Sequence, residues 1–347
     1  MLSGRTVAAA LAGAWRRSPP QLEITAKQVA TIAPLLLASG AGALCWWRLR
    51  YCSEQLPSIA QEQLQKAYRY CAIHAAMHER QVAEIFRVLR SAGVEPMLLK
   101  GWAAGRLYPE AGLRPSGDID LVVAPQEYEA ARGVLNRPEN RGYWVDLDHD
   151  EITRFDRRSF EDLYNRSELV KLGDTEVRIF GPEDHLRILC LHLLKHGACR
   201  PLWLCDIAAA LESRPPSFDW DRCLGRNKRR AQRVLCTIAL ANRLLGAHLG
   251  DAPVTEDVPA WLPASVLKQW KAPYPPNLPL ISTDISRHWR EPAVLLEHLG
   301  KRWPNPIQAT MDADGDFDKA PRLPFQIRNC FARGMRLLQQ FPDMQRI

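Results

Sequence analysis

The chain has 347 residues, 46% of them hydrophobic and 24% charged, which excludes disordered, fibrous and low-complexity proteins and leaves room for two ordinary domains or one extended domain. Forty-six Lys and Arg residues against 39 Asp and Glu residues give a net charge of +7. That balance favours a phosphorylated ligand or partner without requiring a nucleic-acid surface.

The cysteines indicate a reducing environment. They are nine in number and include no Cys-x-x-Cys pair, so neither a disulfide framework nor a zinc ribbon is predicted, and a cytoplasmic location is expected. The segment from Met1 to Arg17 resembles a weak signal peptide, but Arg16 and Arg17 stand where small cleavage-site residues belong. Export is therefore not expected.

The apolar stretch from Thr31 to Trp47 is the one candidate membrane span. It is shorter than the roughly 20 apolar residues that a span requires, and Pro34, Gly40 and Gly42 interrupt it. We predict a buried helix and turn there, and no membrane span.

The first third of the chain is predicted to be helical. From Ile24 to about Arg90, apolar residues recur at steps of three and four with polar residues between them, which is the spacing of amphipathic helices. The segment Ser91-Ala-Gly93 should end the last helix, because Gly93 suits the left-handed position that follows a helix.

Four short apolar runs of strand length come next. They span residues 96–99, 119–123, 143–148 and 176–180. A short helix is expected over 103–108. The middle third is therefore predicted to be an α/β core with a small mixed sheet of about four strands.

Helical spacing returns after Pro182, over 183–194, 203–211, 231–245 and 325–340. Frequent prolines after Asp251 exclude other long elements there. We divide the chain into a helical N-terminal region (1–90), an α/β core (91–182), a helical domain (183–250) and a Pro-rich C-terminal extension with a terminal helix (251–347).

Asp118 and Asp120 carry the clearest chemical signal. They stand two apart at the start of a predicted strand, so their carboxylates project from one face of the sheet. Carboxylates that close repel each other, and a divalent cation such as Mg²⁺, which prefers hard oxygen ligands, removes the repulsion. A third carboxylate is expected on a neighbouring strand, where Asp146 and Asp148 again share a face and either could complete the site.

A glycine turn and basic residues accompany the acids. Gly101 lies at a predicted strand-to-helix junction, where backbone N–H groups and the helix dipole favour phosphate, and Lys100 adds a positive charge. Arg114, four residues before Asp118, can reach the same phosphates.

With these residues the sequence resembles the nucleotidyltransferase superfamily typified by DNA polymerase β, which has a Gly-containing turn, Asp-x-Asp on the next strand and a later third acid. More narrowly, it is similar to a bacterial family of uncharacterised nucleotidyltransferases. The segments that carry the resemblance, within roughly residues 25 to 245, are Lys100-Gly101, Arg114-Pro115 to Leu121, Asp146-Leu147 and Pro182-Glu-Asp184 to His196. Trp102 departs from the wider superfamily, which has a second small residue after the turn glycine.

The resemblance implies an α/β nucleotidyltransferase core flanked by helical regions. It also implies transfer of a nucleoside monophosphate from an NTP to an acceptor, with release of pyrophosphate. Asp118 and Asp120 would bridge two Mg²⁺ ions, with Mn²⁺ as an alternative, and Asp146 would bind the ion that lowers the acceptor pKa. The nucleotide-binding residues would be Lys100, Gly101, Arg114, Ser116 and Lys195. The NTP stays open, as does the acceptor. A small molecule, a peptide or a protein is favoured as the acceptor, and a nucleic acid such as an RNA end stays an alternative.

Two other kinds of function are weighed against this one. The first is a catalytically inactive binding or regulatory module with the same fold. The second is a zinc hydrolase, because His192 and His196 are one helical turn apart. The absence of a base between them and of a third ligand favours packing at an interface or contact with the nucleotide instead.

Two further charged segments are interpreted as solvated surface. The basic run 226–230 has no interleaved aromatic residues, which disfavours a nucleic-acid surface. Asp316 and Asp318 repeat the Asp-x-Asp pattern, but in an acidic loop without a glycine turn or a strand. They are interpreted as a decoy.

Overall fold

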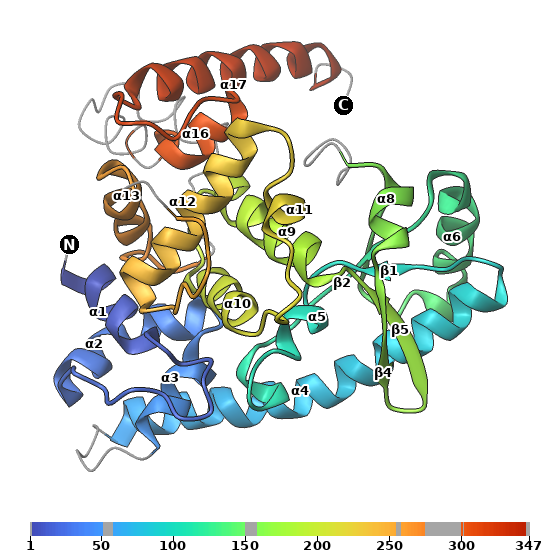
Figure 1. Cartoon of the computed structure of the whole chain (residues 1–347), viewed down its shortest axis with the longest axis horizontal. Helices are drawn as coiled ribbons and strands as arrows, with labels where there is room; N and C mark the ends of the chain where they lie inside the picture. The colour runs from blue at the N-terminus through green and yellow to red at the C-terminus, as the bar shows by residue number, and fades with distance from the viewer. Residues whose placement is uncertain are drawn as a thin grey trace.

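A computed structural model describes residues 2–50, 58–149, 158–254, 258–274, 300 and 302–344. In this part of the chain a five-stranded mixed sheet lies at one side of a largely helical body (Figure 1). The predicted fold class, a small mixed sheet flanked by helical regions, is confirmed.

Helices precede the sheet, as predicted. They are α1 (Leu2–Leu11), α2 (Ala26–Ala38), α3 (Gly42–Leu49) and the long α4 (Ser58–Ser91). A capping box starts α2, because the side chains of Thr25 and Gln28 each accept a hydrogen bond from the backbone N–H of the other. The stretch 31–47 forms the end of α2, a turn and most of α3. Gly93 follows α4 with φ +77°, the predicted left-handed conformation.

The sheet has one more strand than predicted. Its strands are β1 (Met97–Leu98), β2 (Ile119–Val122), β3 (Val145–Asp148), β4 (Glu168–Leu172) and β5 (Thr175–Ile179), in the order β3-β2-β1-β5-β4. The pairs β2–β3 and β1–β5 are parallel, and β1–β2 and β4–β5 are antiparallel. Four strands match the predicted runs. The strand β4 is not predicted, because it is an edge strand with only one buried residue and is defined by its hairpin with β5.

Short helices join the strands and longer ones follow them. Between the strands lie α5 (Trp102–Gly105), η1 (Ala111–Leu113), η2 (Pro125–Glu127), α6 (Tyr128–Leu135), η3 (Pro138–Asn140) and α8 (Phe160–Asn165). After the sheet come α9 (Pro182–Lys195), α10 (Pro201–Glu212), α11 (Trp220–Leu224), α12 (Lys228–Leu245), α13 (Trp261–Gln269), α16 (Pro306–Asp312) and α17 (Leu323–Met344). The predicted helices over 183–194, 203–211, 231–245 and 325–340 are confirmed as α9, α10, α12 and α17. The helix predicted over 103–108 is shorter, because α5 ends at Gly105.

The two faces of the sheet pack against different helices. Ile119 and Leu121 of β2 point into a core shared with α4 and α6. Val122 points into a second core, shared with Leu163 of α8 and Ile188 of α9. Because side chains alternate along a strand, Asp120 lies on the same face as Val122, toward α9.

The N-terminal helices share a hydrophobic core with helices that follow the sheet. Side chains of α1, α2 and α3 pack with those of α9, α10, α12 and α13 around fully buried residues such as Leu11, Leu44 and Leu240. In Figure 1 the blue helices accordingly lie beside α10 and α12. The predicted division into four domains stays a prediction. This core joins the predicted N-terminal region (1–90) to the predicted helical domain (183–250).

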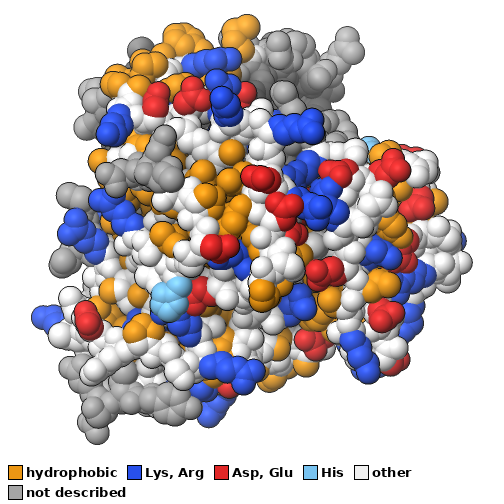
Figure 2. All heavy atoms as spheres, in the orientation of Figure 1, with side chains coloured by type: hydrophobic (Ala, Val, Ile, Leu, Met, Phe, Trp, Pro, Cys, Tyr) orange, Lys and Arg blue, Asp and Glu red, His pale blue; other side chains and the backbone are white. Residues whose placement is uncertain are grey.

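The surface carries charges of both signs. On the face that Figure 2 shows, Lys and Arg side chains are interspersed with Asp and Glu side chains rather than gathered into one basic field. None of the helices in the described ranges is long and apolar enough to cross a membrane.

The basic run and the decoy Asp-x-Asp pair contact each other. Arg229 donates to Asp316, with Nε 2.6 Å from Oδ1, and also to Asp314. Asp318 pairs with Arg322. The second Asp-x-Asp thus pairs with arginines, one half-exposed and one buried, and its interpretation as a decoy stays a prediction.

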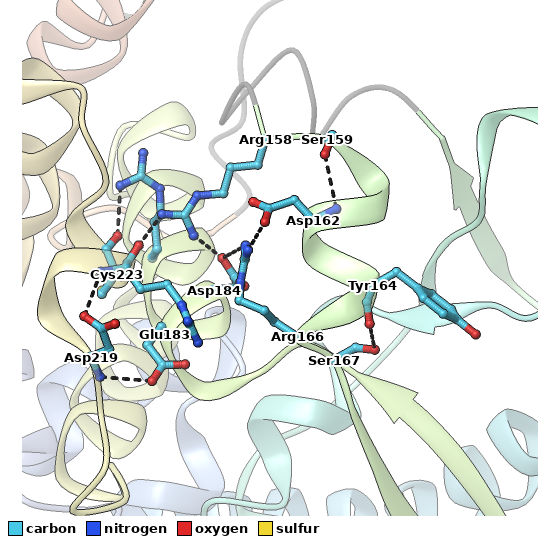
Figure 3. Close-up of polar contacts among 12 residues, drawn as sticks. Arg158, Ser159, Asp162, Tyr164, Arg166, Ser167, Glu183, Asp184, Asp219 and Cys223 are labelled. Carbon is cyan, nitrogen blue, oxygen red and sulfur yellow. Dashed lines mark hydrogen bonds and ion pairs between the residues drawn. The ribbon is translucent and has the colours of Figure 1, made fainter.

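A buried carboxylate connects the sheet side of the molecule to the helices after it. Asp184, 1% exposed at the start of α9, accepts hydrogen bonds from Arg158 and from Arg166, whose Nε lies 2.8 Å from Oδ2 (Figure 3). Arg158 also donates to the backbone of α11, at Arg222. Arg166 also donates to Asp162 of α8. The two arginines therefore join α8, α9 and α11 through one anion.

The variant Asp184→Asn is expected to destabilise the protein by about 3 kcal/mol, near the low end for breaking a buried ion pair, because the arginines retain some access to solvent. Urea denaturation measures it. The matched control is Asp162→Asn, whose side chain is 52% exposed and whose loss should cost less than about 1 kcal/mol. Equal effects of the two variants would contradict a central role for Asp184.

Candidate active site

Three carboxylates meet on the face of the sheet that is turned toward α9. Asp120 of β2 is paired in register with Asp146 of the parallel strand β3, and Asp118 immediately precedes β2. One carboxylate oxygen from each of the three lies within 4.8 Å of the others. Among the residues that the structure describes, this is the one group of three or more potential ligand side chains arranged to share a metal ion.

The strand register distinguishes the two candidates for the third acid. Asp146 lies opposite Asp120, whereas Asp148 lies opposite Val122, one step further along the sheet. The Oδ1 atom of Asp148 accepts a hydrogen bond from the backbone N–H of His149 at 2.6 Å. Asp148 lines the cavity next to the carboxylates, which is described below. The cluster of three carboxylates, however, contains Asp146 and not Asp148.

Lys100 lies against the carboxylates. Its Nζ atom is 2.5 Å from Oδ1 of Asp120, a side chain only 6% exposed. Burial raises the pKa of Asp120 above its ordinary value, and the charges of Asp118 and Asp146 raise it further, while Lys100 opposes the rise. Burial and the neighbouring acids therefore disfavour the charged form of the Asp120 carboxylate, and a cation beside it stabilises that form.

Gly101 has a backbone conformation that favours glycine. Its φ is +61° and its ψ is −113°, at the start of α5. A Cβ atom there would lie 3.7 Å from the backbone O of Asp118 and 3.9 Å from Oδ2 of Asp120. The requirement for glycine thus comes from backbone strain rather than from a clash. Because α5 has only one turn, its dipole adds less to phosphate binding than the sequence analysis expects.

The long helix α4 supports the site from the other side of the sheet. His78 is buried, and its Nε2 lies 3.1 Å from the backbone O of Asp118, which accepts the hydrogen bond. Trp102 donates from its indole N–H to Glu79 at 3.0 Å and packs against the core next to α4. The large residue after Gly101 is therefore accommodated by α4.

Arg114 forms a buried ion pair. Its Nη2 atom lies 3.0 Å from Oδ2 of Asp206, a fully buried residue of α10 that also accepts a hydrogen bond from Tyr108. Its Nη1 atom donates to the hydroxyl of Ser116 at 3.2 Å. Arg114 lines the cavity, but its guanidinium is mainly engaged in fixing the loop before Asp118 to α10. Direct phosphate contacts from Arg114 and Ser116 stay predictions.

The sequence analysis does not identify Asp206, although a signal exists. Asp206 is the one charged residue within the apolar stretch 201–211. A lone acid inside an apolar helix implies a buried partner, because an isolated buried charge is costly.

A cavity of about 390 Å³ separates the carboxylates from a wall of helices. The wall carries His192 and Lys195 of α9 and His196 directly after it. Arg200, directly before α10, Trp203 of α10, and Tyr274 complete the wall. Burial is the largest cause that lowers the pKa of Lys195 and, more strongly, that of His192. The sequence-predicted residues Lys100, Gly101, Lys195 and the three acids are thus brought to one cavity, whereas Arg200, Trp203 and Tyr274 are additional.

His192 and His196 face the same cavity but form an aromatic contact. Their ring centroids are 4.5 Å apart, and Trp203 lies 4.7 Å from His192. In the described ranges no third ligand joins them. The zinc-hydrolase alternative therefore has no support from this arrangement, and contact with a ligand in the cavity is favoured.

Comparison with known proteins identifies one relationship. A family model described as "Uncharacterised nucleotidyltransferase" matches residues 27–246, a segment that contains the sheet, the carboxylates and the facing wall of α9 and α10. No curated protein and no solved structure matches the sequence.

Divalent cations are expected to raise the thermal stability of the protein through Asp118, Asp120 and Asp146. At a Mg²⁺ or Mn²⁺ concentration about 100 times the dissociation constant, the gain in unfolding free energy should be about 2.7 kcal/mol. Asp146→Asn should remove the gain, and Asp148→Asn should retain most of it. Thermal denaturation with and without the metal measures both. The reverse ranking would assign the third ligand to Asp148.

Proposed function

Because the chain belongs to a family of uncharacterised nucleotidyltransferases, we propose that it transfers a nucleoside monophosphate from an NTP to an acceptor and releases pyrophosphate. The observation that carries the proposal is the grouping of Asp118, Asp120 and Asp146 within 4.8 Å beside the Lys100-Gly101 turn. Family membership gives the general activity. The cluster of acids next to a basic residue and a glycine turn supports the mechanism.

The donor set suits a hard divalent cation. All three ligand groups are carboxylates, and burial raises the pKa of Asp120, so bound positive charge would relieve a cost already present in the site. Two Mg²⁺ ions, or Mn²⁺ ions, held by Asp118, Asp120 and Asp146 would neutralise the triphosphate and lower the acceptor pKa. In the same proposal Lys100 leaves Asp120 for a phosphate oxygen when the cations bind.

The remaining residues of the cavity position the phosphates. Lys100 and Lys195 supply positive charge from opposite sides of the cavity, one from the sheet and one from α9. Gly101 allows the backbone to approach the phosphates without a side chain between them. Arg114 and Ser116 hold the loop that presents Asp118.

The competing proposal is a module that binds nucleotide without turnover. Such a module would use the same cavity. Binding of a nucleotide without turnover does not require that all three acids, Asp118, Asp120 and Asp146, are present. The presence of all three with Lys100 favours catalysis. The acceptor is identified by incubating the protein with each of four α-³²P-labelled NTPs and a cell extract and detecting labelled product, whereas the binding module would yield none.

Replacing Asp118 or Asp120 by Asn should reduce product formation by about 100-fold or more, because each change removes a charge that holds the cations and their several kcal/mol of transition-state stabilisation. The labelling assay measures it, with circular dichroism to verify folding. Asp316→Asn, which changes the surface Asp-x-Asp, is the matched control and should be silent. Near-normal turnover in either site variant would refute the assignment.

Nucleotide binding should depend on the Lys100-Gly101 turn. Gly101→Val should weaken binding of a non-hydrolysable NTP by about 10-fold or more, because a branched residue is strained at φ +61°. Lys100→Ala should cause a smaller loss that shrinks as salt is added, since only one charge is removed. Isothermal titration calorimetry measures both.

The control for the turn is Gly142→Val, at an exposed glycine that has open space around its Cβ position. It should leave the affinity unchanged. If folded Gly101→Val binds as tightly as this control, the triphosphate lies elsewhere.

A further inference from the structure

We propose that Trp203, with Tyr274 and Arg200, forms a platform that stacks on the nucleobase of the NTP. This inference rests on the proposed function, and it assigns to the wall of the cavity that faces the carboxylates a role in holding the base. No sequence motif points to these residues, because they come from separate segments, α10 and the chain after α13.

Aromatic rings gather on this wall of the cavity. Trp203 lies 4.7 Å from His192, 5.4 Å from His196 and 5.9 Å from Tyr274, measured between ring centroids. The contacts are tilted or edge-on, and none is a parallel stack. Trp203 is half-buried and lines the cavity, so part of its ring is open to a planar ligand there.

Arg200 is held within the same group. Its guanidinium carbon lies 5.7 Å from the Trp203 ring centroid and 5.4 Å from that of Tyr274, and its Nε donates to the backbone O of Ser39 at 2.8 Å. Burial lowers the pKa of Arg200 below its ordinary value. A partly desolvated guanidinium beside two rings is suited to an electron-rich planar group, since it contributes a cation–π or stacking contact.

The lining of the cavity combines two chemistries. The carboxylates and Lys100 line it from the side of the sheet, and Trp203 and Tyr274, together with Lys195, line it from the facing wall. A ligand that satisfies both joins a flat aromatic group to a polyanion, which is the chemistry of a nucleoside triphosphate. The volume of about 390 Å³ lies within the range of small-molecule sites. The aromatic part of the wall therefore suits the base of the same molecule whose phosphates reach Lys100.

The test separates the base from the phosphates. Calorimetric titration compares two kinds of probe in the presence of Mg²⁺: the α,β-methylene analogues of the four NTPs, and inorganic tripolyphosphate, which has no base. Trp203→Ala should lower the affinity for at least one NTP analogue by about 5- to 150-fold, the effect of removing one base-stacking ring. Its affinity for tripolyphosphate should stay unchanged.

Two further variants control for folding and for the loss of any tryptophan. Trp203→Phe keeps a ring and should keep most of the affinity. Trp303→Ala removes a tryptophan that is 47% exposed and lies outside the cavity lining, and it should have no effect.

Several outcomes would overturn the platform. Unchanged affinity of Trp203→Ala for all four analogues would do so. This holds also if the variant needs a higher acceptor concentration for turnover, because Trp203 would then contact the acceptor and not the base. An equal loss for the analogues and for tripolyphosphate would mean that Trp203 acts through the fold. If the unaltered protein binds the NTP analogues and tripolyphosphate with equal affinity, the base contributes nothing to binding. The inference about Trp203 would then be wrong, whereas the phosphate site would stand. If the unaltered protein binds neither probe, the proposed function itself fails.

Discussion

The parallel register between β2 and β3 is the constraint on which the candidate site depends. It places Asp146 opposite Asp120, and the alternation of side chains then sends both acids to the face near α9. Ile119 and Leu121 of β2 are buried against α4, and Val145 and Leu147 of β3 pack against the same core. A slip of one residue would bury Asp146 among these apolar side chains and move a leucine beside Asp120, so the hydrophobic core enforces the arrangement of the acids.

Buried polar contacts then hold the surroundings of the carboxylates in place. The pair formed by Arg114 and Asp206 attaches the loop before Asp118 to α10, and His78 attaches the backbone of Asp118 to α4. Breaking such a pair by removing one partner is costly, because the remaining charge stays buried. Trp203 lies three residues before Asp206 on α10, so the helix that anchors the acidic loop also presents this ring to the cavity.

The site concentrates unfavourable electrostatics in a small volume. Asp120 is buried beside two other acids, and burial lowers the pKa of His192 and Lys195 on the facing wall. Such costs are typical of sites that bind charged ligands, because the ligand supplies the missing compensation. The helical body that α1–α3 share with α9, α10, α12 and α13 supplies the rigid support against which these groups are held.

Local sequence determined much of this protein. Short apolar runs predict four of the five strands, and helical periodicity predicts the main helices. The i, i+2 spacing of Asp118 and Asp120 places both carboxylates on one face of the sheet. Each of these features depends only on neighbours along the chain. The tertiary structure decided the rest. The grouping of Asp146, rather than Asp148, with Asp118 and Asp120 depends on strand register. The ion pair of Arg114 with Asp206 joins residues 92 positions apart, and Trp203 and Tyr274 meet only through the packing of distant segments. Contacts between distant segments have no local signature, since their partners are set by which apolar faces the whole chain buries together.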